Sequence, residues 1–375
     1  MIVIFYGTSA ELIKLYGIVK NVPRDQQYLI CTAQQHAGLQ KVHQQLNIQP
    51  DIYLAHGWKG ADVANMKQML GMMLSAHGNF AMQYGKIRKI IKANELKYQT
   101  KSIVLVHGDT LTTVVGSYLG RILRLPVAHV EAGLRSGSWK NPFPEEMDRR
   151  IAAKFARVHF PPNDLAEKNL RGESVKGAII NTTFNTAKDA IEVSDDFVSN
   201  DYYGLKLPKH YCLVLLHRTE LLESKNDLEA ILKVIRNHAD KKKQIVFTQH
   251  TTTAEKLKLY GFEHYLDHPY IRAIPKQPYF DFMAIVKNAD YIITDGGGLQ
   301  EDSFFLGIPV IVHRQRTERQ EGIGFNAQLS EMNVNKVADF LDNHKDKKDF
   351  AKLRDNVSPS NVVIGYLAKN NYLSL

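Results

Sequence analysis

The stretch "SIVLVHGDTLTTVVG", residues 102–116, is an apolar, β-branched run that ends in a polar turn and continues into a helical pattern. Runs of the same kind recur at "IVIFYG" (2–7), "QYLICTA" (27–33), "PVAHVEAG" (126–133), "YCLVLLH" (211–217), "QIVFTQH" (244–250), "YIITDGGG" (291–298) and "PVIVHR" (309–314). Near-continuous apolar strands that alternate with helices are typical of parallel sheets buried on both faces. The sequence therefore predicts an α/β protein.

The apolar runs fall into two groups of four, one before residue 135 and one after residue 210. Residues 178–208 between them mix Asn, Thr, Asp and Ser with little continuous apolar pattern. A chain of 375 residues is also long enough for two domains. We expect two Rossmann-like doubly wound domains, with the boundary after residue 177.

Composition excludes several classes of protein. No segment approaches the length of an apolar membrane span, and the start of the chain has no basic region before its apolar run, so we expect neither a membrane span nor a signal peptide. Cys31 and Cys212 lie inside strand-like runs, which favours buried packing in a reducing cytoplasm over a disulfide. The formal charge is +9, but the lysine clusters "DKKKQ" (240–244) and "KDKKD" (345–349) carry acids and no aromatic residues. We therefore expect no nucleic-acid partner.

Two carboxylates stand at the ends of neighbouring predicted strands. Asp109 follows the run at 102–107, and Glu131 follows the next run along the chain. Ligands of open α/β sheets bind outside the carboxyl ends of the strands, so both acids are candidates for a site, although Asp109 alone could be a helix cap. Because neighbouring carboxylates repel, at least one pKa in the pair should rise towards neutrality, which provides an acid and a base at pH 7.

A third acid, Glu145, begins a predicted helix in "NPFPEEMDRR" (141–150). Glu145 and Arg149 are four residues apart and share a helix face, so an exposed ion pair would explain them. The preceding loop contains Trp139 and Phe143 and is more aromatic than a plain surface connection. This favours a site.

The first strand ends in "YGTSAELIK" (6–14), where Thr8 or Ser9 could cap the following helix and Glu11 lies in its first turn. Capping is a better explanation of this turn than ligand contact. Lys14 faces either a ligand or solvent.

The second half of the chain carries features suited to phosphate. His217 and Arg218 follow a strand, and "TDGGGLQED" (294–302) places Gly296, Gly297 and Gly298 between a strand and a helix, where backbone N–H groups can approach a diphosphate. Asp302, in the first turn or so of that helix, could reach ribose hydroxyls. "HRQRTERQEG" (313–322) adds three arginines. Together these features suggest a nucleoside diphosphate.

Other chemistries find little support. The glycine segment is not G-x-G-x-x-G and no Walker lysine follows it, so neither a dinucleotide fold nor a kinase is indicated. The chain has no H-E-x-x-H, C-x-x-C or G-x-S-x-G pattern. We expect no metal, no cofactor and no serine hydrolase.

Five strings resemble, in order and spacing, the UDP-N-acetylglucosamine 2-epimerase family, and the resemblance runs from residue 1 to about residue 325. The strings are "HGDTLTT", "HVEAGLRSG", "PFPEEMDRR", "TDGGGLQED" and "TERQE". The resemblance implies the glycosyltransferase-B fold, in which two Rossmann-like domains face each other across a cleft. It also implies that the last segment returns to the first domain as a helix, which gives domains of 1–177 with 360–375, and 178–359.

The resemblance implies that a UDP-sugar in the cleft is epimerised at C2, by elimination of UDP to a 2-acetamidoglucal and its re-addition. It places the catalytic acids at Asp109, Glu131 and Glu145, and we count His217 with them. It places the remaining substrate contacts at Lys14, Arg149, Gly296, Gly297, Gly298, Asp302 and Arg319, with Phe282 near the uracil. A homodimer is implied as well.

The chain departs from the family pattern at several positions. These are Ser9 for arginine, Ala37 for a glutamine of the allosteric segment, Phe184 and Leu216 for glycines, and Asp302 for glutamate. The departures leave open a hydrolysing epimerase that releases UDP and free N-acetylmannosamine, or a different UDP-sugar. A glycosyltransferase would share the fold and the nucleotide site but does not need three acids around C2.

Overall fold

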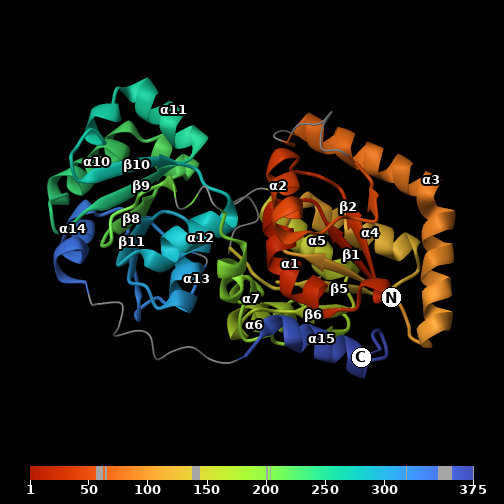
Figure 1. The fold of residues 1–375 in the computed structure, drawn as a ribbon. Helices are drawn as coiled ribbons and strands as arrows, with labels where there is room; N and C mark the ends of the chain where they lie inside the picture. The colour runs from red at the N-terminus through yellow and green to blue at the C-terminus, as the bar shows by residue number, and fades with distance from the viewer. Residues whose placement is uncertain are drawn as a thin grey trace. The chain divides into compact units, whose positions relative to one another are not determined.

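The computed structural model describes residues 1–55, 62–63, 66–136, 144–199, 202, 204–317, 319–344 and 357–374. The chain forms two compact units, Met1–Glu192 with Val357–Leu375, and Val193–Asn356. Each unit is a Rossmann-like domain built on one parallel sheet, as Figure 1 shows. The predicted α/β class with two such domains is confirmed. The cluster 345–349 and the aromatic residues Trp139 and Phe143 lie outside the described residues.

In the described part of the first unit, the sheet has the strand order β3-β2-β1-β4-β5-β6-β7. The strands are β1 (Ile2–Tyr6), β2 (Gln27–Cys31), β3 (Ile52–Tyr53), β4 (Ile103–His107), β5 (Val127–Val130), β6 (Val158–Phe160) and β7 (Ala178–Ile179). The helices are α1 (Ser9–Asn21), α2 (Ala37–Leu46), α3 (Met66–Tyr98), α4 (Leu111–Ile122), α5 (Glu145–Phe155), α6 (Asp164–Gly172), α7 (Ala187–Glu192) and α15 (Pro359–Lys369). In the centre of this sheet, Ile4 of β1 is in register with Leu29 of β2 and Leu105 of β4.

In the described part of the second unit, the strand order is β10-β9-β8-β11-β12-β13. The strands are β8 (Cys212–Leu215), β9 (Ile245–Gln249), β10 (Ile271–Pro275), β11 (Tyr291–Thr294), β12 (Val310–Val312) and β13 (Ala327–Leu329). The helices are α9 (Thr219–Leu222), α10 (Lys225–His238), α11 (Thr251–Tyr260), α12 (Tyr279–Asn288), α13 (Gly297–Leu306) and α14 (Val334–Asn343).

The unit boundaries fall at 192/193 and 356/357, whereas the sequence led us to expect 177/178 and 359/360. The first boundary lies later because β7 pairs with β6 and α7 packs against α1. α15 also packs against α1, beside α7 (Figure 1). A Cβ on Gly17 of α1 would lie only 2.5 Å from Oγ of Ser360, so this glycine permits the close approach of α15.

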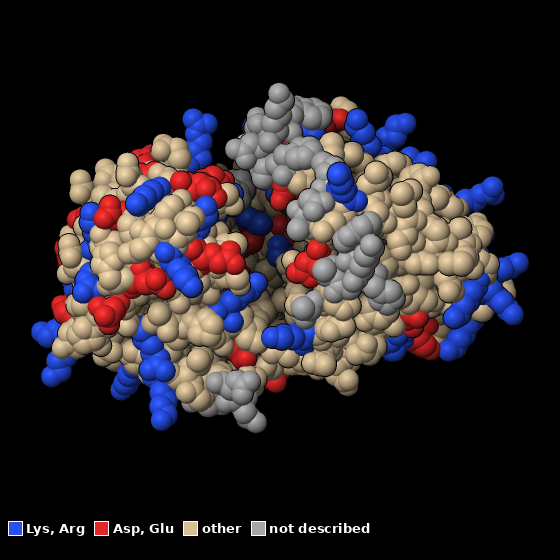
Figure 2. All heavy atoms as spheres, turned by 90° about the horizontal axis from the view of Figure 1, so that it is seen from above, with Lys and Arg blue, Asp and Glu red and all other residues tan. Residues whose placement is uncertain are grey.

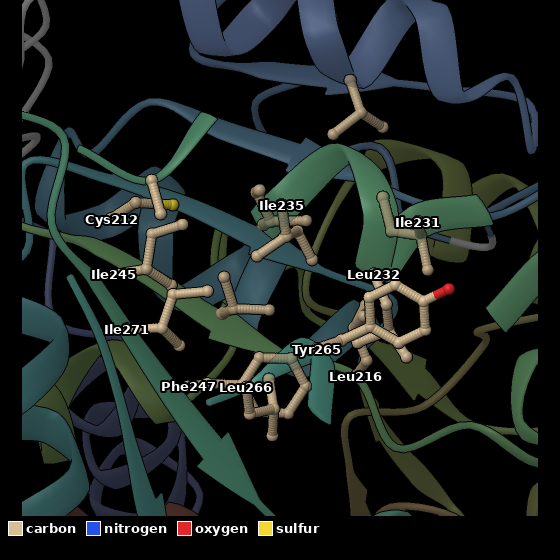
Figure 3. Close-up of a cluster of buried hydrophobic side chains, with 14 of the residues drawn as sticks. Cys212, Leu216, Ile231, Leu232, Ile235, Ile245, Phe247, Tyr265, Leu266 and Ile271 are labelled. Carbon is tan, nitrogen blue, oxygen red and sulfur yellow. The ribbon is translucent and has the colours of Figure 1, made fainter. Parts of the chain in front are cut away.

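One hydrophobic cluster of the second unit joins residues of its sheet to the helices α10 and α14. Figure 3 shows Cys212, Ile235, Ile245 and Phe247 in this cluster. Cys212 and Cys31 are both buried, and neither forms a disulfide. This confirms the prediction of buried packing.

Charged side chains are spread over the surface of each unit. On the face shown in Figure 2, Lys and Arg are interspersed with Asp and Glu. The basic side chains on this face are therefore dispersed among acidic ones and do not form a single basic patch. Among the helices of the described residues, none combines the length and apolarity needed to cross a membrane.

In each sheet there is one place from which successive strands are added in opposite directions across the sheet, although all the strands run parallel. This switch point lies between β1 and β4 in the first unit, and between β8 and β11 in the second. Turns that follow such strands are the usual ligand-binding positions of open α/β sheets.

Candidate active site

The turn after β1 is built around Glu11. Thr8 caps α1, and the carboxylate of Glu11 accepts hydrogen bonds from the backbone N–H groups of Gly7 and Thr8, each at 2.8 Å. The hydroxyl of Thr110, at the start of α4, donates to Glu11 at 2.6 Å. Burial raises the pKa of Glu11 to about 7 in spite of these donors. Capping by Thr8 is confirmed, and Glu11 in addition ties the starts of α1 and α4 together.

Asp109 lies in the turn after β4, preceded by Gly108 with a φ of 70°. Thr110 caps α4 in place of Asp109, so the carboxylate of Asp109 is free to meet another group. Nη2 of Arg149 donates to Asp109 at 2.5 Å, and Nη1 donates to Glu146 at 3.3 Å. Burial opposes the charge of Arg149, but Asp109 and the neighbouring acids raise its pKa above the ordinary value. The arginine therefore remains a cation beside Asp109.

His129 of β5 contacts the backbone of the same turn. Its Nε2 lies 2.7 Å from the carbonyl oxygen of Gly108, and burial lowers the pKa of His129 to about 4. The imidazole is therefore neutral near pH 7, and its Nε2–H donates to Gly108.

Glu131 follows β5 and has a left-handed backbone with a φ of 63°, which is unusual for a residue other than glycine. Its side chain is only 7% exposed. Nζ of Lys14, from α1, lies 2.7 Å from Oε2 of Glu131, and Nε2 of His107 lies 3.4 Å from the same oxygen. Lys14 therefore faces an acid of the candidate site.

Glu145 is the first residue of α5. The simple explanation from the sequence, an exposed Glu145–Arg149 pair, is wrong, because Arg149 is buried and donates to Asp109 and Glu146. Oε2 of Glu145 is buried and has no hydrogen-bond partner among the described residues.

Asp148 was not singled out by the sequence. It lies in the first turn of α5 and is 3% exposed. Burial, followed by the charges of Asp109 and Glu145, raises the pKa of Asp148 to about 7. We call Asp109, Glu131, Glu145 and Asp148 the acid cluster. Arg149 is influenced by the charges of both Asp109 and Glu131, which links the acids of the two strand ends.

The switch point of the second unit contains a buried acid that the sequence analysis missed. Asp295 follows β11 and is 1% exposed. It accepts hydrogen bonds from the backbone N–H of His217, at 3.0 and 2.9 Å, and from that of Arg218 at 2.9 Å. No sequence pattern indicates these bonds, because their donors are backbone groups after a different strand. Asp295 therefore fixes the turn that carries His217.

The side chain of His217 is about one-third exposed, with Nδ1 3.2 Å from Oδ1 of Asp295. Its ring centroid lies 4.9 Å from that of His250. Burial, with His217 as the next cause, lowers the pKa of His250 to about 4. Both imidazoles of the pair are partly buried.

The glycine segment forms the N-terminus of α13. Gly296 is the N-cap and Gly297 the first helical residue. A Cβ on Gly296 would lie 2.8 Å from Cε1 of His217, so the imidazole packs directly on this glycine. A Cβ on Gly298 would meet no atom within 4 Å. The backbone at Gly298 is therefore open to approach, as an anion at a helix N-terminus requires.

Asp302 is the sixth residue of α13, so it lies in the second turn and not in the first turn that the sequence suggested. The preceding Glu301 is 1% exposed and pairs with Nη1 of Arg319 at 2.8 Å. The side-chain amide of Gln300 donates to the carbonyl of Arg319 at 3.2 Å. α13 therefore holds Arg319 through two consecutive side chains. Phe282 is half-buried on α12.

Among the residues that the structure describes, no group of three or more His, Cys, Asp or Glu is arranged to hold a metal ion. Each unit thus carries a candidate site of its own. Acids and cations gather at the strand ends of the first unit, and backbone donors, His217 and Arg319 lie around the start of α13 in the second.

Comparison with known proteins gives a consistent result. The sequence model of the family described as UDP-N-acetylglucosamine 2-epimerase matches residues 19–359. The UDP-N-acetylglucosamine 2-epimerase of Bacillus subtilis (strain 168) is 32% identical over 324 residues, which are 85% of this chain and 80% of that protein.

Among solved structures, UDP-GlcNAc 2-epimerase from Methanocaldococcus jannaschii has a TM-score of 0.76 at 26% identity, over 98% of this chain and 99% of that chain. The structure of that epimerase in complex with UDP-GlcNAc and UDP has a TM-score of 0.73, with the same identity and coverage. The predicted glycosyltransferase-B-like fold is confirmed. Because the family model matches most of its length, this chain belongs to the UDP-N-acetylglucosamine 2-epimerase family.

Proposed function

We propose that the chain is a non-hydrolysing UDP-GlcNAc 2-epimerase, which interconverts UDP-GlcNAc and UDP-ManNAc. The observation that carries this proposal is the acid cluster, where carboxyl groups from two strand ends and one helix gather around Lys14 and Arg149. The presence of UDP-GlcNAc and UDP in the Methanocaldococcus jannaschii complex supports a UDP-sugar as the substrate.

The proposed reaction needs groups that remove and return one proton at C2. A base takes the C2 proton, the C–H electron pair forms the C1–C2 double bond, and the C1–O bond breaks with its electrons on UDP. Addition of UDP to C1 of the 2-acetamidoglucal, with protonation of C2 on the opposite face, completes the inversion. Because the proton leaves C2 from one face of the sugar and returns to the other, acid and base groups must stand on both faces. Asp109, Glu131 and Glu145 supply them.

In this proposal the second unit binds the diphosphate of the same substrate. The N-terminus of α13 presents backbone N–H groups and the positive end of the helix dipole to an anion. His217, whose turn is held by Asp295, and the guanidinium of Arg319, held by Glu301, add side-chain donors. Phe282 is assigned to the uracil, and Asp302 to the ribose.

A hydrolysing epimerase is the alternative. Its first half-reaction is the same, but water captures the glycal, and UDP and free N-acetylmannosamine are released. The two enzymes differ in their products and share the chemistry at C2. Incubation of the chain with UDP-GlcNAc in heavy water, followed by NMR, separates them.

Deuterium at C2 of both UDP-GlcNAc and UDP-ManNAc is the expected result. Free N-acetylmannosamine with UDP would favour the hydrolysing enzyme. The epimerase proposal fails if no C2 exchange occurs with UDP-GlcNAc or related acetamido sugars. Asp109→Asn should abolish exchange while UDP still binds, and Asp164→Asn, an exposed acid in the first turn of α6, is its matched control.

We further propose that the chain forms a homodimer. On α3, the apolar side chains of Leu70, Leu74 and Met82 are 58%, 66% and 76% exposed and follow one another at multiples of four residues. An apolar stripe of this kind on a helix is suited to a subunit interface. Sedimentation of the purified chain as a monomer would exclude the proposal.

A further inference from the structure

Asp148 is a buried acid that the proposed reaction does not use. It is 3% exposed, and its Oδ2 has no hydrogen-bond partner among the described residues. A buried carboxylate without donors is costly, whereas a buried carboxylic acid is much less so. The position therefore favours the protonated form of Asp148.

The charged groups around Asp148 point the same way. Glu145 lies on the same helix, and Asp109 approaches from the turn after β4; both add negative charge. Arg149, the next residue on the helix, uses its two Nη groups to donate to Asp109 and Glu146. α4, which packs against α5, carries no ionisable side chain from Leu111 to Ser117. Among the described residues, no cation is therefore paired with Asp148.

We propose that Asp148 is a positioning residue of the epimerase reaction, which holds a proton and so stays uncharged beside Asp109 and Glu145. This inference rests on the proposed function, because it assigns the neighbouring acids to the chemistry at C2. Among the described residues no hydrogen bond joins Oδ2 of Asp148 to either acid, so its influence on them passes through charge. While Asp148 is protonated it adds no repulsion to its neighbours, and it does not touch the sugar.

Electrostatics supports this role. Burial raises the pKa of Asp148 to about 7, and the charges of Asp109 and Glu145 add to the effect. A negative charge that appears on one carboxyl group disfavours ionisation of its neighbours, so loss of the proton from Asp148 would act on Asp109 and Glu145. The pH dependence of turnover is therefore the direct test.

The first experiment compares wild type with Asp148→Asn, which is isosteric and cannot ionise. Wild-type kcat should show a titration with a midpoint near the pKa of Asp148, about 7. In the variant this midpoint should disappear or move by at least about one pH unit, while KM changes less than about twofold. Asp164→Asn, which removes an exposed acid from the first turn of α6, should keep the wild-type profile. An unchanged profile in Asp148→Asn overturns the inference and leaves the epimerase proposal intact.

The second experiment does not depend on activity. The pKa of Asp148 is about 7 in the folded chain and about 3.9 in an unfolded one, so its stabilisation is fully present below about pH 4 and is lost as the pH rises to about 7. Asp148→Asn does not undergo this loss. The variant should therefore gain stability relative to wild type between about pH 4 and about pH 8 in thermal unfolding. If the difference in stability between the variant and wild type is the same at about pH 4 as at about pH 8, the inference is contradicted.

If Asp148→Asn fails to fold, carbon-13 NMR of the wild-type chain labelled at aspartate carboxyls takes its place. One aspartate that titrates near pH 7 supports the inference, and titration of every aspartate below about pH 5 overturns it. If wild type shows no C2 exchange, the epimerase proposal fails, and the positioning role of Asp148 fails with it. The NMR titration separates this outcome from a failure of the inference alone, because it detects the proton on Asp148 without any need for activity.

Discussion

Buried acids of the two units are held in different ways. In the second unit, Asp295 at the end of β11 accepts hydrogen bonds from backbone N–H groups. In the first unit, Glu145 and Asp148 of α5 each have a buried carboxyl oxygen without a hydrogen-bond partner among the described residues. The acid at the strand end thus has satisfied hydrogen bonds, whereas these two acids on the helix each keep an unsatisfied oxygen.

The difference separates binding from reactivity. Asp295 accepts the backbone N–H groups of His217 and Arg218, so it shapes the turn that carries His217. Burial raises the pKa of Asp148 to about 7, so this acid can gain or lose a proton near neutral pH, as the proposed chemistry at C2 requires.

Replacement of an acid in the first unit should have the largest effect. Glu131→Gln removes the charge beside Lys14 but keeps the shape of the side chain. We expect kcat to fall roughly 100- to 10,000-fold, the usual contribution of an acid–base group, with UDP affinity nearly unchanged. Turnover is measured by C2 exchange in heavy water, and UDP binding by calorimetry.

The matched control is Glu192→Gln, which removes an exposed glutamate at the end of α7. It should retain wild-type kcat. Full activity in Glu131→Gln would refute the assignment of this residue as a catalytic acid.

Replacement of the anchored acid in the second unit should affect binding. Asp295→Ala leaves the backbone N–H groups of His217 and Arg218 without their acceptor. Because hydrogen bonds to a charged group contribute about 1.5–3 kcal/mol, UDP affinity should fall roughly 10- to 100-fold and the melting temperature should drop. Calorimetric titration with UDP and thermal unfolding give the two values.

Asp295→Asn retains one oxygen acceptor and should lie between wild type and Asp295→Ala. Wild-type UDP affinity in Asp295→Ala would show that this acid does not position the diphosphate site.

A smaller effect is expected from Gly298→Val. A side chain there meets no protein atom within 4 Å, so the fold should tolerate it, but it would stand where a phosphate must approach the backbone. UDP affinity should fall roughly tenfold, equivalent to about 1.4 kcal/mol. Gly365→Val, at an equally open position on α15, is the control for the change in helix propensity. Equal UDP affinity in the two variants would remove Gly298 from the binding site.

The smallest effect concerns stability at acid pH. Burial lowers the pKa of both His129 and His250 to about 4, whereas an unfolded chain has histidines near about 6.5. Their contribution to stability is therefore present above about pH 6.5 and is lost as the pH falls to about 4. Unfolding in urea at intervals across this range should show the decline. His250→Gln should make the decline shallower, and an identical slope would mean that His250 does not titrate as stated.

The sequence predicted the central strands because each is a continuous apolar run buried on both faces. It missed β3, β6, β7, β10 and β13. β10 shows the reason, because only two of its five residues are buried and its pattern resembles a loop. β6 is fully buried, but its sequence is interrupted by His159 and is not a continuous apolar run.

The candidate site was predictable where a residue type and its position at a strand end suffice, as for Asp109 and Glu131. It was not predictable where the partner comes from a distant turn. Asp295 is recognised only through the backbone of His217, and Asp148 only through its burial next to Asp109. The contact of Arg149 with Asp109 likewise depends on how α5 packs beside the turn after β4, which helical spacing alone does not give.

The packing of α15 on α1 has a consequence for synthesis of the chain on the ribosome. α15 follows the whole second unit in the sequence, yet it covers Gly17 of α1, and Ser360 donates its N–H to Asp189 of α7 at 2.8 Å. The first unit emerges early but lacks this cover until α15 leaves the exit tunnel. The second unit is contiguous in the chain and can finish folding before the first.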